Sequence, residues 1–260
     1  MGPGERLLEL VAYRGLIQSL TARELRLKYR RSALGAVWSL LNPLLMMAVY
    51  VLIFGVFLKI FTLPEYWAYL LTGLIAWLFF ANALGTSVTT LVQNPNLVTK
   101  IYFPLEALPI AGALANFVNF CISMALLALA VIVAGRPVGP SLVLLPIVMV
   151  AQLGFSVGLA VLLSALTVYL RDIEHLVGIF LTGLFYVTPV LYPLSRAGRY
   201  ARYLRLNPMT WIIECYHSIL YFGTWPDPRL FALTLLAAAV SLVGGYLVFL
   251  RLRPRLPEEL

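Results

Sequence analysis

The chain has 260 residues, of which 62% are hydrophobic and only 12% are charged, and its mean hydropathy is +0.92. Soluble domains are about 25% charged, so this balance excludes a soluble globular protein and predicts an all-α integral membrane protein. The formal net charge of +8 would suggest nucleic acid in a soluble protein. Here the basic residues lie mostly at the ends of apolar runs, where headgroups and topology account for them, and no nucleic-acid partner is expected.

Residues 1–32 are predicted to form a cytoplasmic, amphipathic interface segment. Apolar residues recur at helical spacing between residues 5 and 20, with polar residues between them. The run from Thr21 to Glu24 has the form of a capping box, which predicts the start of a second helix. An amphipathic helix directly before a membrane span is expected to lie along the interface, either as a passive anchor or as a docking surface for a cytoplasmic partner.

Residues 33–255 are predicted to form a six-helix transmembrane domain, followed by a cytoplasmic tail over 256–260. Six apolar runs are each long enough to cross a bilayer. They cover about residues 34–61, 67–91, 107–134, 141–168, 175–192 and 230–250.

The first of these runs follows a basic cluster and carries Asn42-Pro43 near its start. A proline inside a helix removes one backbone hydrogen bond and bends the helix. We therefore expect this step to bend the first span, to free a carbonyl near its cytoplasmic end and to shape an entrance or gate.

A seventh apolar run, from Met209 to Gly223, lies within a predicted external loop over 193–228. It is too short to span comfortably, and it contains Glu214 and His217. A short re-entrant or interfacial helix between the fifth and sixth spans fits these properties.

The basic residues predict the orientation, since cytoplasmic loops of membrane proteins carry an excess of Lys and Arg. Six crossings place twelve of the 19 Lys and Arg residues inside and seven outside, with both termini in the cytoplasm. The external exception is the group of four arginines within Arg196–Arg205, interleaved with Tyr200 and Tyr203. These arginines are expected either to reach lipid headgroups or to contact a secreted ligand.

Several spans carry uncharged polar residues at helical spacing, which should face other helices or a pathway rather than lipid. They are Asn82, Thr86, Thr89 and Gln93 on the second span, Asn116, Asn119 and Ser123 on the third, and Gln152 and Ser156 on the fourth.

Charged groups are missing from the interior of the predicted spans, where no Asp, Glu, Lys, Arg or His occurs away from the ends. Ion-coupled carriers and membrane enzymes usually need such groups, and no phosphate-binding loop motif is present. We therefore expect no catalytic residue, no metal and no cofactor on this chain, and we expect another chain to supply the energy for any uphill transport.

Two loops face the cytoplasm in this topology, Val92–Pro109 and Tyr169–Leu176. Both are short and mixed in polarity, so they could transmit motion from a cytoplasmic engine or simply connect helices. Asp172 and Glu174 could form a catalytic pair or be merely solvated, since their spacing does not place them on one helix face.

Three segments of the chain resemble segments of a known family. They are RELRLKYRRSALGAVWSLLNPLL, GLAVLLSALTVYLRDIEHLVGIFLTGLFYVTPVLYP and LNPMTWIIECYHSILYFG. In this order and spacing they are similar to ABC-2 type permeases that export lipid-linked polysaccharide, such as O-antigen, capsule or teichoic acid. The resemblance covers about residues 20–250. One departure is His217, where many relatives are expected to have arginine, and no anion-binding role is carried over to this position.

The resemblance implies a permease of the bacterial cytoplasmic (inner) membrane, built as a homodimer with two ATP-binding cassette subunits that hold ATP and Mg. It implies that the amphipathic N-terminal helix and the two cytoplasmic loops contact those subunits. The residues implied in coupling are Asn94, Lys100, Tyr102, Phe103, Arg171, Asp172, Glu174 and His175.

The substrate that the resemblance implies is an undecaprenyl-diphosphate-linked polysaccharide. Its diphosphate is expected near Arg26, Lys28, Arg30 and Arg31, unless these residues only set the topology. Sugar faces can stack on aromatic rings, so the candidate channel-lining residues are Trp38, Asn42, Phe185, Tyr186 and Tyr192, which could instead pack or form an interface belt. The alternatives are an ABC-2 exporter of another lipid or drug, a membrane enzyme acting on lipid-linked sugars, and a secondary carrier.

Overall fold

The computed structural model describes residues 12–30, 34–57, 63–100, 103–136, 139–256 and 258–259. Within these ranges the chain forms helices and turns with no strand, as expected for an all-α protein. Of the predicted functional residues, Arg31, Tyr102 and the side chain of Lys100 lie outside the described part.

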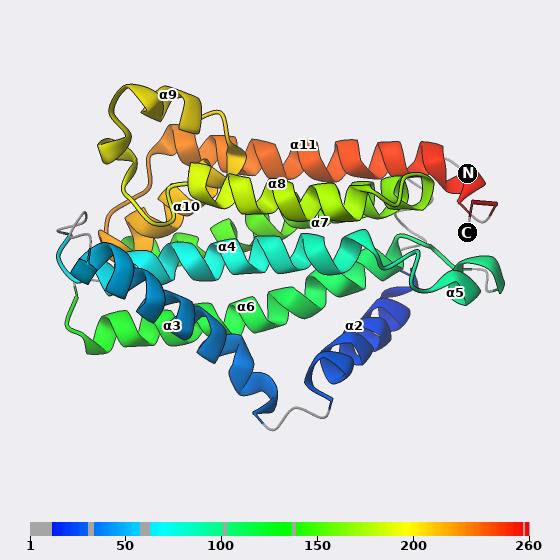
Figure 1. Ribbon diagram of the computed structural model, residues 1–260, viewed down its shortest axis with the longest axis horizontal. Coiled ribbons are helices and arrows are strands. Elements are labelled where there is room, and N and C mark those ends of the chain that lie inside the picture. The colour runs from blue at the N-terminus through cyan, green and yellow to red at the C-terminus, as the bar shows by residue number, and fades with distance from the viewer. Residues whose placement is uncertain are drawn as a thin grey trace.

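Five helical segments of the described chain are long and apolar enough to cross a membrane. They form an elongated bundle in which the long helices run side by side (Figure 1). Their helices are α3 (Trp38–Tyr50) with a π-helical continuation, η2 (Val51–Phe57); α4 (Tyr66–Val88); α6 (Ala107–Val133); η3 (Pro140–Leu144) with α7 (Leu145–Tyr169); and α11 (Pro228–Leu252) with η6 (Arg253–Arg255).

The predicted fifth span is shorter than expected, because α8 (Ile173–Val187) has only 15 residues. At about 1.5 Å per residue it is about 22 Å long, whereas the hydrocarbon core of a bilayer is about 30 Å thick. By length and composition, the described helices therefore support five spans and one shorter apolar helix.

Shorter elements lie at the two ends of the bundle. α2 (Arg14–Tyr29) and α5 (Pro95–Lys100) lie towards one end. At the other end lie η4 (Leu194–Tyr200), α9 (Ala201–Leu204), α10 (Pro208–Tyr216) and a π-helical turn, η5 (His217–Tyr221) (Figure 1). The seventh apolar run thus folds as α10 and η5, and its length does not reach across the bundle.

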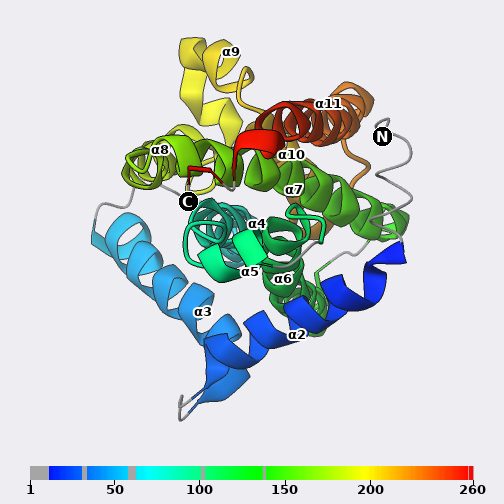
Figure 2. The same ribbon diagram turned by 90° about the vertical axis from the view of Figure 1, so that its right-hand side faces the viewer.

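α4 is the centre of the bundle. It packs against α3, α6, α7, α8 and α10, and Figure 2 shows it enclosed by its neighbours. The apolar window of α4 is 78% buried, against 6% for Leu40–Phe57 on the first span. Met46, Met47, Tyr50, Val51 and Phe54 pack partly against the core, and the exposed side of the first span faces lipid or another protein.

Polar side chains on the inner helices join the bundle internally. The Gln152 side chain on α7 donates to the Ala76 carbonyl of α4 (2.8 Å), and its carbonyl oxygen accepts from the Tyr216 hydroxyl of α10 (2.8 Å). A buried amide whose hydrogen bonds are satisfied in this way fixes the register of three helices.

α7 and α11 make the closest helix contact. A Cβ atom at Gly245 would lie 2.1 Å from the Gly158 carbonyl oxygen, and one at Gly158 would lie 2.2 Å from Ser241 backbone atoms. Only glycine allows this approach, which is typical of small-residue packing between membrane helices.

Two local predictions about the N-terminal third need correction or refinement. The described part of α2 is one continuous helix and not two, because the Thr21 hydroxyl donates to the Ile17 carbonyl (2.7 Å) instead of capping a new helix. α3 stays helical through Pro43, and the irregular backbone of the first span lies at η2.

A buried carboxylate joins α6 to the end of α11. Glu106, directly before α6, is 1% exposed, and its Oε1 lies 3.7 Å from the Arg253 guanidinium and 3.5 Å from the Tyr246 hydroxyl. Its Oε2 has no hydrogen-bond partner among the described residues. Since a buried charge without its counter-ion is costly, Arg253 is the residue that makes Glu106 tolerable there.

We expect Arg253→Gln to lower the free energy of unfolding by about 1–3 kcal/mol, because it leaves the Glu106 carboxylate buried without its counter-ion. The measurement is thermal unfolding of the detergent-purified protein. Arg251→Gln, at an exposed site on the same helix end, is the matched control and should change stability by less than about 0.5 kcal/mol. Adding Glu106→Gln to Arg253→Gln should recover part of the loss. Equal stability of the two arginine variants would contradict a role for this pair.

Candidate functional site

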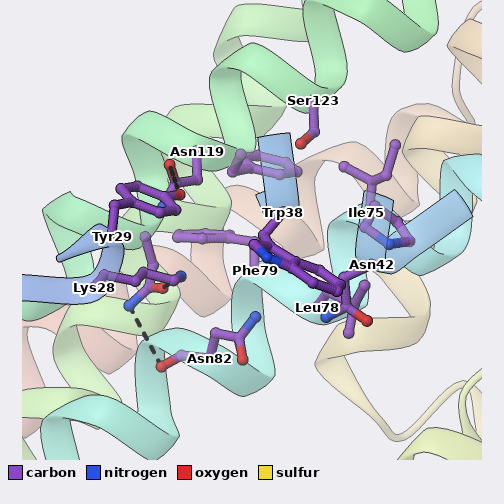
Figure 3. Close-up of a pocket in the computed structure, with 13 residues that line it drawn as sticks. Lys28, Tyr29, Trp38, Asn42, Ile75, Leu78, Phe79, Asn82, Asn119 and Ser123 are labelled. Atoms are coloured by element: carbon purple, nitrogen blue, oxygen red, sulfur yellow. Dashed lines mark hydrogen bonds between the residues drawn. The ribbon is translucent and has the colours of Figure 1, made fainter. Parts of the chain in front are cut away.

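A polar cavity of about 390 Å³ lies between α2, α3, α4 and α6 (Figure 3). α2 and α3 form the two arms of a V that faces α4 and α6 (Figures 1 and 2). The lining residues of the cavity are Lys28, Tyr29, Trp38, Asn42, Pro43, Ile75, Leu78, Phe79, Asn82, Asn116, Asn119, Phe120 and Ser123.

The floor of the polar cavity comes from one face of α6. Asn116, Asn119 and Ser123 follow helical spacing and are all buried. The Asn116 amide donates to the Thr86 hydroxyl and to the Gly112 carbonyl, both at 3.0 Å. Because these bonds use the amide nitrogen, the oxygen of the Asn116 carboxamide is the end that points into the cavity.

Two residues at the C-terminal end of α2 close the cavity on one side. The Lys28 ammonium donates to Asn116 Oδ1 (3.1 Å), and the Tyr29 hydroxyl donates to Asn119 Oδ1 (2.7 Å). The Asn119 amide nitrogen is buried and has no hydrogen-bond partner among the described residues. Since buried donors are nearly always paired, this nitrogen would bond a ligand or a water that reached it when the surrounding side chains move.

Lys28 supplies the positive charge of the polar cavity. The residue as a whole is exposed, while its ammonium reaches in to Asn116. Burial of this ammonium lowers the pKa of Lys28 below its ordinary value. A phosphate or another anion that entered the cavity would offset the cost of this desolvation.

The mouth and walls of the cavity combine amides with aromatic rings. Trp38, Asn42 and Asn82 are exposed at the mouth, and the Phe79 and Phe120 rings stack with centroids 4.7 Å apart. Carboxamides bond hydroxyl groups in either direction, and aromatic faces stack on sugars. The arrangement therefore suits a polar ligand that is rich in hydroxyl groups and carries a negative charge.

The lining of the cavity suits binding better than it suits catalysis. No Asp, Glu, His or Cys lies among its lining residues. In the described ranges, no group of three or more such residues is placed to hold a metal. Asp172 and Glu174, the possible acid pair, are exposed at the start of α8.

The predicted ligand residues divide between the cavity and other places. Lys28, Trp38 and Asn42 come together around the cavity. Arg26 is exposed on α2, and Arg30 is exposed directly after the helix.

Three predicted channel residues lie elsewhere. Phe185 is buried between the rings of Trp77 (5.5 Å) and Tyr50 (5.8 Å), so it packs α8 onto its neighbours. Tyr186 is 55% exposed, and the half-buried Tyr192 donates its hydroxyl to the Tyr186 carbonyl. None of the three lines the polar cavity, and their role in transport stays a prediction.

The predicted coupling residues gather at the end of the bundle that holds α5 and the start of α8 (Figure 1). Asn94, just before α5, accepts a hydrogen bond from the Arg23 guanidinium of α2 (3.0 Å). Phe103 is buried in an apolar cluster with Leu20 of α2. The described part of the loop is thus attached directly to α2.

The second predicted coupling loop is open to solvent. Arg171, Asp172, Glu174 and His175 are all exposed. This exposure leaves the four residues accessible to a partner at the same end of the bundle as α5 (Figure 1).

Sequence reasoning identified most of the cavity floor without assigning it. Asn82, Asn116, Asn119 and Ser123 stand in the polar stripes of two spans, but the stripes do not show which helices face each other. Tyr29 was missed, because a tyrosine within a basic cluster has no pattern that distinguishes it from an interface residue.

Comparisons with known proteins place these features in a family context. The family model described as "ABC-2 type transporter" matches residues 15–221. The chain is 38% identical over 239 residues to an O-antigen export system permease protein RfbA of Myxococcus xanthus, covering 90% of each chain. It is 26% identical to an RfbA permease of Klebsiella pneumoniae (94% and 95% covered) and 25% identical to the polysialic acid transport protein KpsM of Escherichia coli (76% and 78% covered).

The lowered pKa of Lys28 predicts unusual reactivity. Only the neutral amine is acylated, so Lys28 of the folded protein should become reactive at a lower pH than Lys28 of the denatured protein. The measurement is competitive acylation across a pH series, followed by mass spectrometry of the peptide that carries Lys28. Asn116→Leu removes an acceptor that stabilises the charged form and should move the midpoint lower still. Equal midpoints in the folded and denatured protein would show that the ammonium is solvated.

Proposed function

Because this chain belongs to the ABC-2 type transporter family, we propose that it is the membrane-spanning permease of an exporter that moves a polysaccharide across the bacterial cytoplasmic membrane. The observation that carries this proposal is the 38% identity to an O-antigen export permease over 90% of both chains. The family model covers residues 15–221, which include the residues that line the polar cavity.

The proposed substrate is a polysaccharide linked through a diphosphate to an undecaprenyl lipid. The cavity chemistry supports it, since amides and aromatic rings suit sugar hydroxyls and faces, and Lys28 suits a phosphate. In this mechanism the diphosphate replaces Asn116 as the partner of the Lys28 ammonium. Arg26, Arg30 and Arg31 would hold the incoming anion at the membrane surface.

The proposed topology has six crossings with both termini in the cytoplasm. α8 would be the fifth crossing, continued by the turn that follows it, and α10 with η5 would form a re-entrant pair at the external side. The burial of α10 against α4, α7 and α11 supports a segment inserted among the helix ends. A polar backbone can lie at membrane depth only when protein surrounds it in this way.

The proposed assembly is a homodimer of this chain with two ATP-binding cassette subunits, which would bind ATP and Mg. The exposed apolar side of the first span supports a protein partner in the membrane. The ATPase would contact the end of the bundle that holds α5. The contact residues there would be Asn94, Lys100, Tyr102, Phe103 and the exposed residues from Arg171 to His175.

Energy transfer would run through α2. ATP binding would close the ATPase subunits against the loop that holds Asn94, and the Arg23–Asn94 hydrogen bond links that loop to α2. A shift of α2 would move Lys28 and Tyr29 away from Asn116 and Asn119. The polar cavity would then open towards the first span, along which the substrate would move.

Deletion of the gene should remove the surface polysaccharide and cause lipid-linked polymer to accumulate in the cell, and the natural chain should restore export. Unchanged surface polysaccharide with an altered drug sensitivity would contradict the proposal and favour an ABC-2 exporter of another compound.

Variants of the cavity floor test where the substrate binds. Asn119→Leu should reduce export about fivefold, the expected cost of one lost hydrogen bond in the path, while the protein remains at its normal level in the membrane. Thr182→Val is the matched control, since Thr182 is exposed on α8 and its hydroxyl donates to the Gly178 carbonyl of its own helix. Both measurements use surface polysaccharide in the complemented deletion strain. Equal export by the two variants would exclude this cavity from the path.

A further inference from the structure

A second polar feature lies far from the cavity, on the segment formed by η4 and α9. This segment lies at the end of the bundle opposite α5 and projects sideways beyond α8 and α11 (Figures 1 and 2). Because the long helices are expected to span the bilayer, a segment that leaves the bundle sideways at their ends is expected at the level where the bilayer meets water. The arginines on this segment are the external exception to the charge rule, and the proposed polysaccharide path does not use them.

The η4–α9 segment has an inner face and an outer face. Leu194 is buried, and Ala197, Ala201 and Leu204 are partly covered. The exposed residues are Arg196, before a non-helical bend at Gly198, then Arg199, Tyr200, Arg202 and Tyr203, and directly after α9 Arg205 and Leu206; together they are called the outer face. Tyr200 and Tyr203 are 56% and 54% exposed, and Leu206 is 75% exposed. Basic and aromatic residues exposed beside an apolar inner side are typical of a segment that lies in a membrane interface.

The four arginines have no negative partner in the part of the protein that the structure describes. The run from Leu194 to Leu206 contains no Asp or Glu, and none of the four arginines forms an ion pair with a described carboxylate. A guanidinium has five N–H donors, so each of these side chains keeps donors for an external anion.

Two of the arginines are held in place by the next residue. The Arg199 guanidinium lies 5.0 Å from the Tyr200 ring centroid and donates to the Tyr200 hydroxyl (3.0 Å). Arg202 repeats this arrangement with Tyr203, at 4.6 Å and 2.6 Å. Stacking places each charge at the level of a tyrosine ring, and tyrosine prefers the headgroup layer of a bilayer.

We propose that the η4–α9 segment binds the phosphate groups of anionic phospholipids in the leaflet opposite α5, and so anchors this end of the permease. The outer-face arginines supply charge-assisted hydrogen bonds to phosphate, while Tyr200, Tyr203 and Leu206 enter the headgroup layer. The surrounding bilayer is the occupant, and the exported polymer is not. The segment projects on the side of the bundle away from α2 and α3, which border the polar cavity (Figure 2).

The test places an environment-sensitive fluorophore at Leu206→Cys, after Cys121 and Cys215 have been replaced by alanine. The labelled permease, with its ATPase partner, is reconstituted in nanodiscs of phosphatidylcholine, with or without phosphatidylglycerol. Both kinds of disc carry a nitroxide quencher on the headgroup. Quenching should be about twofold or more greater in the anionic discs, and about 1 M salt should reduce this difference.

Arginine variants show whether charge causes the effect. Replacing the four outer-face arginines by glutamine should abolish the difference between the two lipids, and replacing them by lysine should keep a large part of it. Arg229→Gln, at an exposed site near the start of α11, is the control and should leave the difference unchanged. ATPase activity in neutral discs reports that each variant is folded.

Three outcomes would overturn the proposal. The first is equal quenching in the two lipids, and the second is a difference that survives the loss of all four arginines. The third is efficient disulfide crosslinking between the two protomers of the unlabelled Leu206→Cys variant through the introduced thiols, because a second copy of the chain would then cover this face.

Discussion

The architecture depends on one constraint, which is that a polar group among apolar helices must find a partner inside the protein. Gln152 meets it with α4 and α10, and Glu106 meets it in part with Arg253. Where the constraint is met completely, helices are fixed against each other. The Asn119 amide nitrogen has no partner among the described residues, and Asn119 lines the cavity that can receive a ligand.

The polar cavity shows how a chain with so few charges can bind a charged and hydroxylated substrate. Its amides are neutral, so burying them costs much less than burying ions would. The cation among its lining residues, Lys28, comes from α2, which lies outside the long helices, and it is already hydrogen-bonded to Asn116. A neutral acceptor is a weaker partner than a phosphate, so the resting contact can be exchanged. Because the resting contact is weak, both the substrate and the loop attached to α2 could shift the position of α2.

The arginines at the two ends of the bundle have different partners. At the end with α5, Arg23 and Arg253 bond to side chains of the protein and join helices to one another. At the other end, Arg136 bonds internally to Glu65 and lies over the Tyr221 ring, whereas the arginines of η4 and α9 point outward. Arginines that pair within the protein fix helices against each other, and arginines that point outward can bind groups outside the protein. One residue type thus serves two purposes according to whether a carboxylate or carboxamide lies within reach.

Hydropathy and helical period were enough to predict the membrane class, the long helices to within a few residues, and the polar stripes on the second and third spans, because these are local properties of the chain. The family was also predictable, since three segments in a fixed order are a specific signal. The packing of the bundle was needed to show that Lys28, Tyr29, Trp38, Asn42 and the α6 amides surround one cavity, and that Phe185 packs away from it. Side chains 88 or 90 residues apart, such as Lys28 and Asn116 or Tyr29 and Asn119, meet only when α2 lies across α6. That placement depends on contacts among all the helices, and no local pattern encodes it.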